Sequence, residues 1–335
     1  MFAKLKKIKN YLLIFFALII VVMSLSLGTI YAKKDLRYGV TFSKKQAEDL
    51  GLDWQKLYLA MLDELQIKKL RLVAYWDEIE RNKDQYDWAA LDWQVTQATE
   101  KKAEIILAIG GRLPRWPECH FPDWTYELNV DEQESKLLDY ITQTVVRYRD
   151  QPLITAWQIE NEPFLLNFGV CPKLNKKLLD REIALVRQLD SRPIVVTDSG
   201  ELSWWVSAAK RADIFGTTMY RNTYSSKLDS YIHYPIGPSF FIIKRNLARI
   251  FAQPKDWLVI ELQAEPWGPS YLSEMNQAER DKTMSIEKFK EMIEFSSQTG
   301  FREFYLWGVE WWYWEKEKNN RPAFWEYAKT IYKNE

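Results

Sequence analysis

Short apolar runs alternate with longer amphipathic stretches from residue 37 to the end of the chain. The short runs are rich in β-branched and aromatic side chains, which predicts strands. Between them, apolar residues recur at three- and four-residue spacing, as they do on one face of a helix. The predicted strands are Tyr38–Phe42, Leu70–Ala74, Glu104–Ile109, Ile154–Glu160, Pro193–Thr197, Ile214–Met219, Trp257–Glu261 and Phe304–Trp307, and the clearest predicted helices are Leu57–Leu65, Glu134–Arg147, Lys176–Leu189 and Ile286–Ser297.

This alternation predicts the fold class. Strands that alternate with helices form parallel sheets, and eight such units in one chain close most simply into a (β/α)8 barrel, also called a TIM barrel. No linker rich in glycine, proline or serine separates the units. We therefore expect one catalytic domain over residues 33–335, with its site at the carboxyl ends of the strands.

A basic segment and then an apolar one precede the predicted barrel. Residues 1–10 contain four lysines, and residues 11–32 form an uncharged, mostly apolar run. About 20 apolar residues in a helix are about 30 Å long, which matches the core of a bilayer. The basic flank favours an amino terminus inside the cell, which predicts a single-pass membrane anchor and a barrel outside the cytoplasm. A signal peptide cleaved after Ala32 is the alternative.

The two cysteines fit a location outside the cytoplasm. Cys119 follows the third predicted strand and Cys171 follows the fourth, so both would lie at the same rim of a barrel. A disulfide between the two loops is one possibility, and a pair of free thiols is the other. The histidines, His120 and His233, have no ligand cluster at fixed spacing around them, so we expect no metal and no cofactor.

Charge and aromatic content narrow the choice of partner. The 46 basic residues balance the 46 acidic ones, so the chain lacks the basic excess that nucleic-acid binding requires. Nothing in the sequence indicates an obligate protein partner. The chain has 16 tryptophans, several of them outside the predicted strands and helices. Exposed rings can bind the flat apolar faces of sugars, although tryptophans that merely pack loops onto the barrel are the alternative.

Two predicted strands end on glutamates. The fourth runs into Asn161 and Glu162, and the seventh ends at Glu261. Two carboxyl groups suffice to cleave a glycosidic bond, because one protonates the leaving oxygen while the other attacks the anomeric carbon. Two alternatives stay open. Glu160 is expected on the same strand face as Glu162, so it is either a buried polar partner or a sign that the strand register differs. Glu265 follows Glu261 by four residues and is the alternative nucleophile.

These strand ends resemble those of the retaining glycoside hydrolases of clan A, which include cellulase-like and β-galactosidase-like barrels. In that clan an Asn-Glu pair ends strand four and a glutamate ends strand seven, while a tyrosine often ends strand six and a tryptophan strand eight. Asn161, Glu162, Glu261, Tyr220 and Trp307 stand at these places. The resemblance covers residue 37 to the end of the chain. It implies that Glu162 is the general acid and base and that Glu261 is the nucleophile. It also implies that Asn161 contacts the sugar 2-hydroxyl, Tyr220 orients Glu261, and Trp307 forms the floor under the sugar.

Other residues of the same rim are further candidates. The segment that begins with Trp76 looks like the second loop of the clan enzymes, and Arg112 and Trp116 follow the third strand. We predict that all three contact substrate. Arg71 is predicted to pair with a carboxylate inside the barrel. One departure is Thr218, which stands where cellulase-like members often carry a histidine.

The sequence therefore predicts a retaining glycosidase that cleaves β-glycosidic bonds of an extracellular oligo- or polysaccharide. A catalytically inactive carbohydrate-binding barrel at the cell surface is the alternative. A phosphate-handling barrel is disfavoured, because the seventh and eighth loops carry only Gly268 and Gly308, and phosphate sites often use glycine.

Overall fold

The structure, a computed structural model, describes residues 2–26, 35–165, 168–172 and 175–333. Eight parallel strands close into a barrel in the order β1-β10-β9-β6-β5-β4-β3-β2, which confirms the predicted (β/α)8 fold. Every predicted strand is found, with its ends displaced by at most two residues. The barrel strands are β1 Arg37–Thr41, β2 Lys69–Val73, β3 Glu104–Ile109, β4 Ile154–Ile159, β5 Ile194–Asp198, β6 Ile214–Met219, β9 Asp256–Gln263 and β10 Glu303–Trp307.

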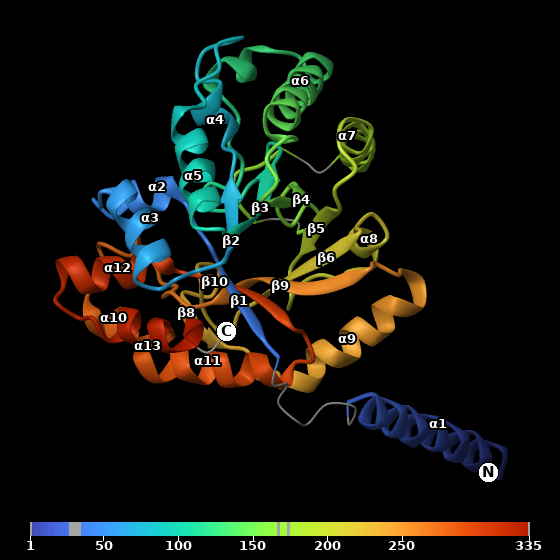
Figure 1. The fold of residues 1–335 in the computed structure, drawn as a ribbon. Helices are drawn as coiled ribbons and strands as arrows, with labels where there is room; N and C mark the ends of the chain where they lie inside the picture. The colour runs from blue at the N-terminus through green and yellow to red at the C-terminus, as the bar shows by residue number, and fades with distance from the viewer. Residues whose placement is uncertain (1, 27–34, 166–167, 173–174, 334–335) are drawn as a thin grey trace.

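Helices surround the barrel on its outside (Figure 1). Several begin at side chains that accept a hydrogen bond from the first helical turn, such as Asn129 before α6 and Ser285 before α11. The helices are α1 Phe2–Ser26, α2 Lys44–Asp49, α3 Trp54–Asp63, α4 Trp76–Ile79, α5 Ala89–Glu100, α6 Val130–Tyr148, α7 Lys176–Leu189, α8 Val206–Ala209, α9 Pro238–Phe251, α10 Gln277–Thr283, α11 Ile286–Gln298, α12 Val309–Lys318 and α13 Ala323–Tyr332.

An antiparallel hairpin that the sequence analysis missed follows β6. It consists of β7 Asn222–Ser225 and β8 Ser230–His233. Gln263 at the end of β9 anchors its base, because the Gln263 side-chain oxygen accepts hydrogen bonds from the backbone N–H groups of Arg221 (2.9 Å) and Asn222 (3.0 Å). The hairpin thus extends the rim beside the ends of β6 and β9.

Side chains fill the inside of the barrel. A compact interior cluster is separate from the larger apolar shell that packs the strands against the helices. A filled interior leaves only the ends of the barrel for a ligand. The interior cluster comprises Ile106, Ala156, Val195, Leu258, Ile260 and Tyr305.

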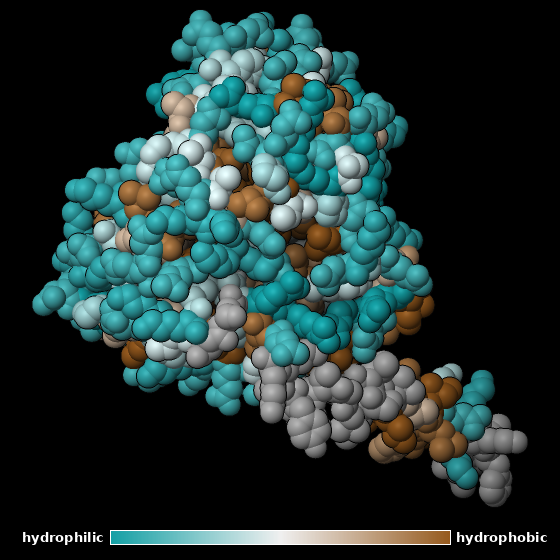
Figure 2. Space-filling model, viewed as in Figure 1, coloured by the Kyte–Doolittle hydropathy of each residue, from teal (hydrophilic) through white to brown (hydrophobic). Residues whose placement is uncertain are grey.

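Exposed apolar side chains lie on α1 between Ile8 and Ile20, and this part of the helix is brown at the lower right of Figure 2. Across the described residues, no helix combines the length and the apolar character that crossing a membrane requires. Residues 27–32 of the anchor or signal segment predicted over residues 11–32 lie outside the described residues. The predicted division into residues 1–10, 11–32 and 33–335 stays a prediction.

Candidate active site

Glu162 and Glu261 lie at the same end of the barrel. Glu162 follows the end of β4, and Glu261 lies near the end of β9. Strands β5 and β6 separate these two strands in the barrel, and both glutamates lie at its mouth. Both side chains are nearly buried, at 6% and 4% exposed. The structure thus brings together the two carboxyl groups that the sequence analysis singled out.

Glu261 is held through both of its oxygens. The guanidinium of Arg71 donates to Oε1 at 2.7 Å, and the hydroxyl of Tyr220 donates to Oε2 at 2.9 Å. Arg71 is fully buried on β2, and Tyr220 directly follows β6. The pairing expected for Arg71 inside the barrel is therefore found, and Tyr220 contacts the glutamate that it was predicted to orient.

Glu162 has a different environment. Its Oε1 accepts a hydrogen bond of 3.1 Å from the hydroxyl of Thr218, and no cation pairs with it among the described residues. Burial raises the pKa of Glu162 well above its ordinary value, and the charges of Glu261 and Glu118 raise it further. Thr218, which departs from the cellulase-like pattern, is thus a direct partner of the predicted acid.

Arg71 also connects the pair to the end of β4. Besides Glu261, it donates to Gln158 Oε1 and to Asn161 Oδ1, each at 2.7 Å. One buried cation therefore has three acceptors in fixed positions, and its planar fork suits such a task. The hydrogen bond from Arg71 to Asn161 holds the Asn161 side-chain amide in position within the site.

The backbone leaves the strand geometry directly after β4. Glu160 and Glu162 adopt φ angles of +58° and +44°, which are strained for residues with a side chain. The Glu160 carboxylate accepts hydrogen bonds from the backbone N–H groups of Gly111 (2.7 Å) and Arg112 (2.5 Å) in the loop after β3. The expectation that Glu160 faces the same side as Glu162 is therefore wrong, because strand alternation ends at Ile159.

Glu265, the alternative nucleophile, belongs to a neighbouring ion-pair cluster. Arg115 pairs with Glu265 and also with Glu310, at 2.8 Å for the second contact. The guanidinium of Arg115 lies 4.0 Å from the ring centroid of Trp307. One face of Trp307 is thus covered by Arg115, so a sugar could stack only on the other face.

The remaining predicted substrate contacts have different outcomes. Trp76 is fully buried and stacks on Tyr140 of α6 with ring centroids 5.4 Å apart, so its prediction as a substrate contact is wrong. The guanidinium of Arg112 donates to the carbonyls of Leu165 and Phe168, each at 3.1 Å, which links two rim loops. Trp116 is 58% exposed. Substrate contact by Arg112 and by Trp116 stays a prediction.

A disulfide joins Cys119 to Cys171, which resolves the choice left open by the sequence. It ties the loop after β3 to the loop after β4. His120 is buried next to it, with its ring 3.7 Å from the carboxylate of Asp77. Across the part of the chain that the structure describes, no three His, Cys, Asp or Glu side chains form a cluster that could hold a metal ion.

The sequence analysis missed two residues of the site, Glu118 and Arg115. Both are buried in the loop after β3, and Glu118 accepts a hydrogen bond of 3.2 Å from the Asn161 amide nitrogen. No periodicity marks a loop residue, so the only available signal was their position beside Cys119 at the predicted rim.

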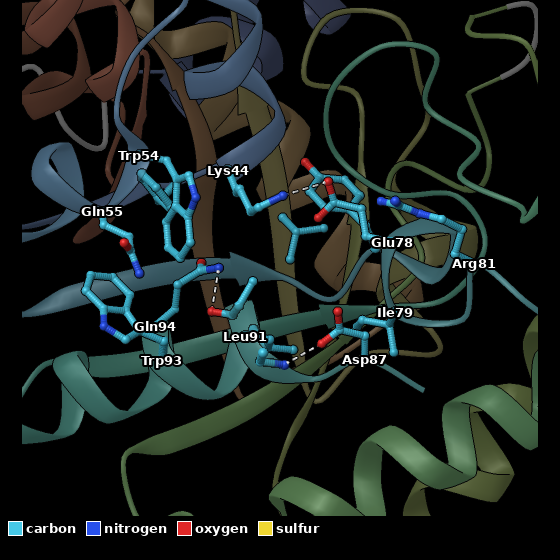
Figure 3. A pocket seen from close by; sticks show the side chains of 15 residues that line it. Lys44, Trp54, Gln55, Glu78, Ile79, Arg81, Asp87, Leu91, Trp93 and Gln94 are labelled. Atoms are coloured by element: carbon cyan, nitrogen blue, oxygen red, sulfur yellow. Dashed lines mark hydrogen bonds and ion pairs between the residues drawn. The ribbon is translucent and has the colours of Figure 1, made fainter. Parts of the chain in front are cut away.

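A cavity of about 360 Å³ lies between the first two strands and helices α3 and α5 (Figure 3). Trp54 and Trp93 line one side of it, and the ion pair between Lys44 and Glu78, at 3.3 Å, lies on another. Neither Glu162 nor Glu261 lines this cavity. It is therefore distinct from the carboxylate pair.

A second cavity, of about 300 Å³, lies behind the rim between α6 and α7. The disulfide lines it together with Glu160 and Glu182. Burial raises the pKa of Glu182 well above its ordinary value, and the charge of Glu160 raises it further. Oε2 of Glu182 has no hydrogen-bond partner among the described residues. A neutral, protonated Glu182 is the form that fits this site.

Comparison with known proteins supports the fold. The sequence matches no protein-family model and no curated protein. The structure is similar to a β-glucosidase from Exiguobacterium marinum, with a TM-score of 0.54 and 14% identity over 83% of this chain and 90% of that chain. A GH5_18 protein from Streptomyces cattleya in complex with GlcNAc gives 0.55 and 13% over 83% and 71%, and a β-galactosidase from Bacillus circulans sp. alkalophilus gives 0.54 and 13% over 81% and 50%. At these identities the likeness concerns the fold alone: the chain shares the (β/α)8 barrel of these glycoside hydrolase structures.

Proposed function

We propose that the protein is a retaining glycosidase that cleaves β-glycosidic bonds, with Glu162 as general acid and base and Glu261 as nucleophile. The observation that carries the proposal is the contrast between the two environments. Glu261 forms an ion pair with Arg71, whereas Glu162 has a hydroxyl partner and a raised pKa. Two carboxyl groups whose surroundings differ in this way are suited to opposite roles.

In the first step, Glu162 donates its proton to the leaving oxygen while Glu261 attacks the anomeric carbon. The glycosidic bond breaks, and a glycosyl ester forms on Glu261. The ester removes the charge of Glu261, so the pKa of Glu162 falls. Glu162 then accepts a proton from water, which attacks the anomeric carbon and releases the sugar and the carboxylate of Glu261.

Other residues of the mouth position the sugar. Asn161 bonds the 2-hydroxyl in this proposal, an interaction that strengthens in the transition state. Trp307, which is 8% exposed, can stack on the apolar face of the sugar ring through the face that Arg115 does not cover. The alternative nucleophile, Glu265, is less suited, because its contacts are with Arg115 in a separate cluster.

The similar structures bear on the substrate, and the disulfide and the amino-terminal sequence bear on the location. The similar structures include a β-glucosidase and β-galactosidases, which suggests glucosides and galactosides as the first substrates to test. The disulfide favours a barrel outside the cytoplasm, as does the basic and apolar amino-terminal sequence. We therefore propose an extracellular oligo- or polysaccharide as substrate.

The test is hydrolysis of aryl β-glycosides and β-glucans by the protein and by three variants. Glu162→Gln should lose activity on substrates with poor leaving groups yet keep much of the first step on activated aryl glycosides. Glu261→Ala should be nearly inactive, and added azide should yield a glycosyl azide of inverted configuration. Glu265→Ala, the matched control, should stay active. Azide rescue of Glu265→Ala instead of Glu261→Ala would reverse the assignment, and sugar binding without any hydrolysis would favour an inactive binding protein.

A further inference from the structure

A third carboxyl group, Glu118, lies beside the glutamate pair, and the mechanism above gives it no role. It is 6% exposed and belongs to the loop after β3. Burial, followed by the charge of Glu261, raises the pKa of Glu118 to about 8. Burying a carboxyl group beside the proposed catalytic pair costs free energy, so we expect its contacts to serve a role.

The loop that carries Glu118 folds back on itself. The backbone N–H of Leu113 donates to the Glu118 carbonyl at 2.7 Å, and the Glu118 N–H donates to the carbonyl of Arg115 at 2.7 Å. Glu118 has a φ angle of +73°, a left-handed conformation that is strained for a residue with a side chain. Such strain persists only where the surroundings determine the conformation, so the loop holds Glu118 in one place.

The loop after β4 holds Glu118 from the other side. The disulfide from Cys119, the next residue, to Cys171 ties the two loops together. Gly169 lies directly against the Glu118 stem at a φ angle of +77°, and a Cβ atom there would be 2.6 Å from the Glu118 Cβ. A larger residue at Gly169 would therefore displace the glutamate.

The carboxyl group that these features hold contacts Asn161. The Asn161 amide nitrogen donates to Glu118 Oε2 at 3.2 Å, while Arg71 donates to the Asn161 oxygen at 2.7 Å. The two partners leave the amide one orientation, whereas the terminal torsion of an isolated asparagine is broad. Among the described residues, no hydrogen bond uses the second N–H of the amide.

We propose that Glu118 is a positioning residue that orients the Asn161 amide toward the substrate 2-hydroxyl, and that the bridge between Cys119 and Cys171 holds Glu118 in that place. This inference rests on the proposed glycosidase activity. It predicts that the contribution of Glu118 depends on the 2-hydroxyl, which a purely structural role would not.

The test compares an aryl β-glycoside that the protein hydrolyses with its 2-deoxy analogue. Glu118→Ala should lower kcat/KM by about 10- to 100-fold on the glycoside, because a small displacement of a positioned group has effects of this size. On the 2-deoxy analogue the loss should be no more than about twofold. Glu118→Gln should recover most of the activity, since its amide oxygen can accept the same hydrogen bond. Glu127→Ala removes an exposed carboxylate from the same segment and should be neutral.

A double variant tests whether Glu118 acts through Asn161. Asn161→Ala alone should lose activity on the glycoside, and adding Glu118→Ala should cause no further loss, because the two residues serve one contact. Losses that multiply, or equal losses on the glycoside and its 2-deoxy analogue, would overturn the proposal. If Glu118→Ala does not fold, Glu118→Met, which keeps the volume, takes its place.

Reduction of the folded protein tests the bridge. With dithiothreitol, the rate on the glycoside should fall toward that of Glu118→Ala, and Glu118→Ala itself should respond little. A reduced protein with full activity would refute the role of the disulfide. The outcomes separate the two proposals: a protein that hydrolyses nothing contradicts the glycosidase function, whereas a hydrolase indifferent to Glu118→Ala contradicts only this inference.

Discussion

Arg71 donates hydrogen bonds to Glu261 and to two neighbouring side chains, and its replacement by methionine tests how much these contacts stabilise the fold. The guanidinium is fully buried and donates to Gln158, Glu261 and Asn161, each at 2.7 Å. Arg71→Met keeps a long apolar stem but removes the charge and all three hydrogen bonds. Glu261 would then be a buried carboxylate without a cation.

The magnitude follows from these contacts. Breaking a buried ion pair by removing one partner costs about 3–5 kcal/mol, because the other charge stays buried and unpaired. Each of the two amide oxygens that lose a donor adds about 1–3 kcal/mol where water cannot reach it. We expect Arg71→Met to lower the free energy of unfolding by at least about 4 kcal/mol. For a domain of this size, that corresponds to a fall in Tm of about 6 °C or more.

The assay is thermal unfolding, followed by calorimetry, of four proteins at neutral pH: the wild type, Arg71→Met, Glu261→Gln and the double variant. The double variant should regain a large part of the stability lost in Arg71→Met, because a neutral glutamine needs no cation. Arg71→Lys should be intermediate, since it keeps the charge and loses the fork. A loss below about 1 kcal/mol in Arg71→Met, or losses that simply add in the double variant, would refute the reasoning.

Three further predictions concern single residues. Tyr220→Phe removes a hydrogen bond to the Glu261 carboxylate, worth about 1.5–3 kcal/mol, so kcat should fall about 10- to 100-fold, and unchanged kinetics would contradict the role. The raised pKa of Glu182 means that the folded state loses stability as pH rises above about 4.5. Glu182→Gln should therefore unfold at a higher temperature than the wild type at pH 8 and at a similar one at pH 4; equal differences would exclude this cause. Trp76→Ala should lose about 3–5 kcal/mol of stability with KM unchanged, and a raised KM would restore Trp76 as a substrate contact.

Most of the fold could be predicted because the relevant signal is local. A buried parallel strand is a short apolar run, and an amphipathic helix has its own period, so each unit can be recognised from a few neighbouring residues. The hairpin of β7 and β8 has no such signal. Its strands have four residues each, and Gln263, some forty residues further along the chain, anchors it.

The site could be predicted in part for the same reason. Glu162 and Glu261 end predicted strands, and a parallel barrel brings such ends to one rim. The burial of Trp76 depends on contact with α6, which the sequence around Trp76 does not reveal. The hydrogen bond from Thr218 to Glu162 follows a register shift between β6 and β9. The shift pairs Thr218 with Glu261 on the neighbouring strand, and the local sequence does not reveal it.

The sequence by itself thus determined the barrel and the carboxyl groups that reach its mouth, since both follow from periodicity and strand ends. Only the tertiary structure decided what each carboxyl group contacts. Arg71 and Glu261 are 190 residues apart in the chain, and Glu118 meets Asn161 across two loops without regular structure. Such contacts depend on how whole strands and loops pack, and packing is set by the entire chain at once.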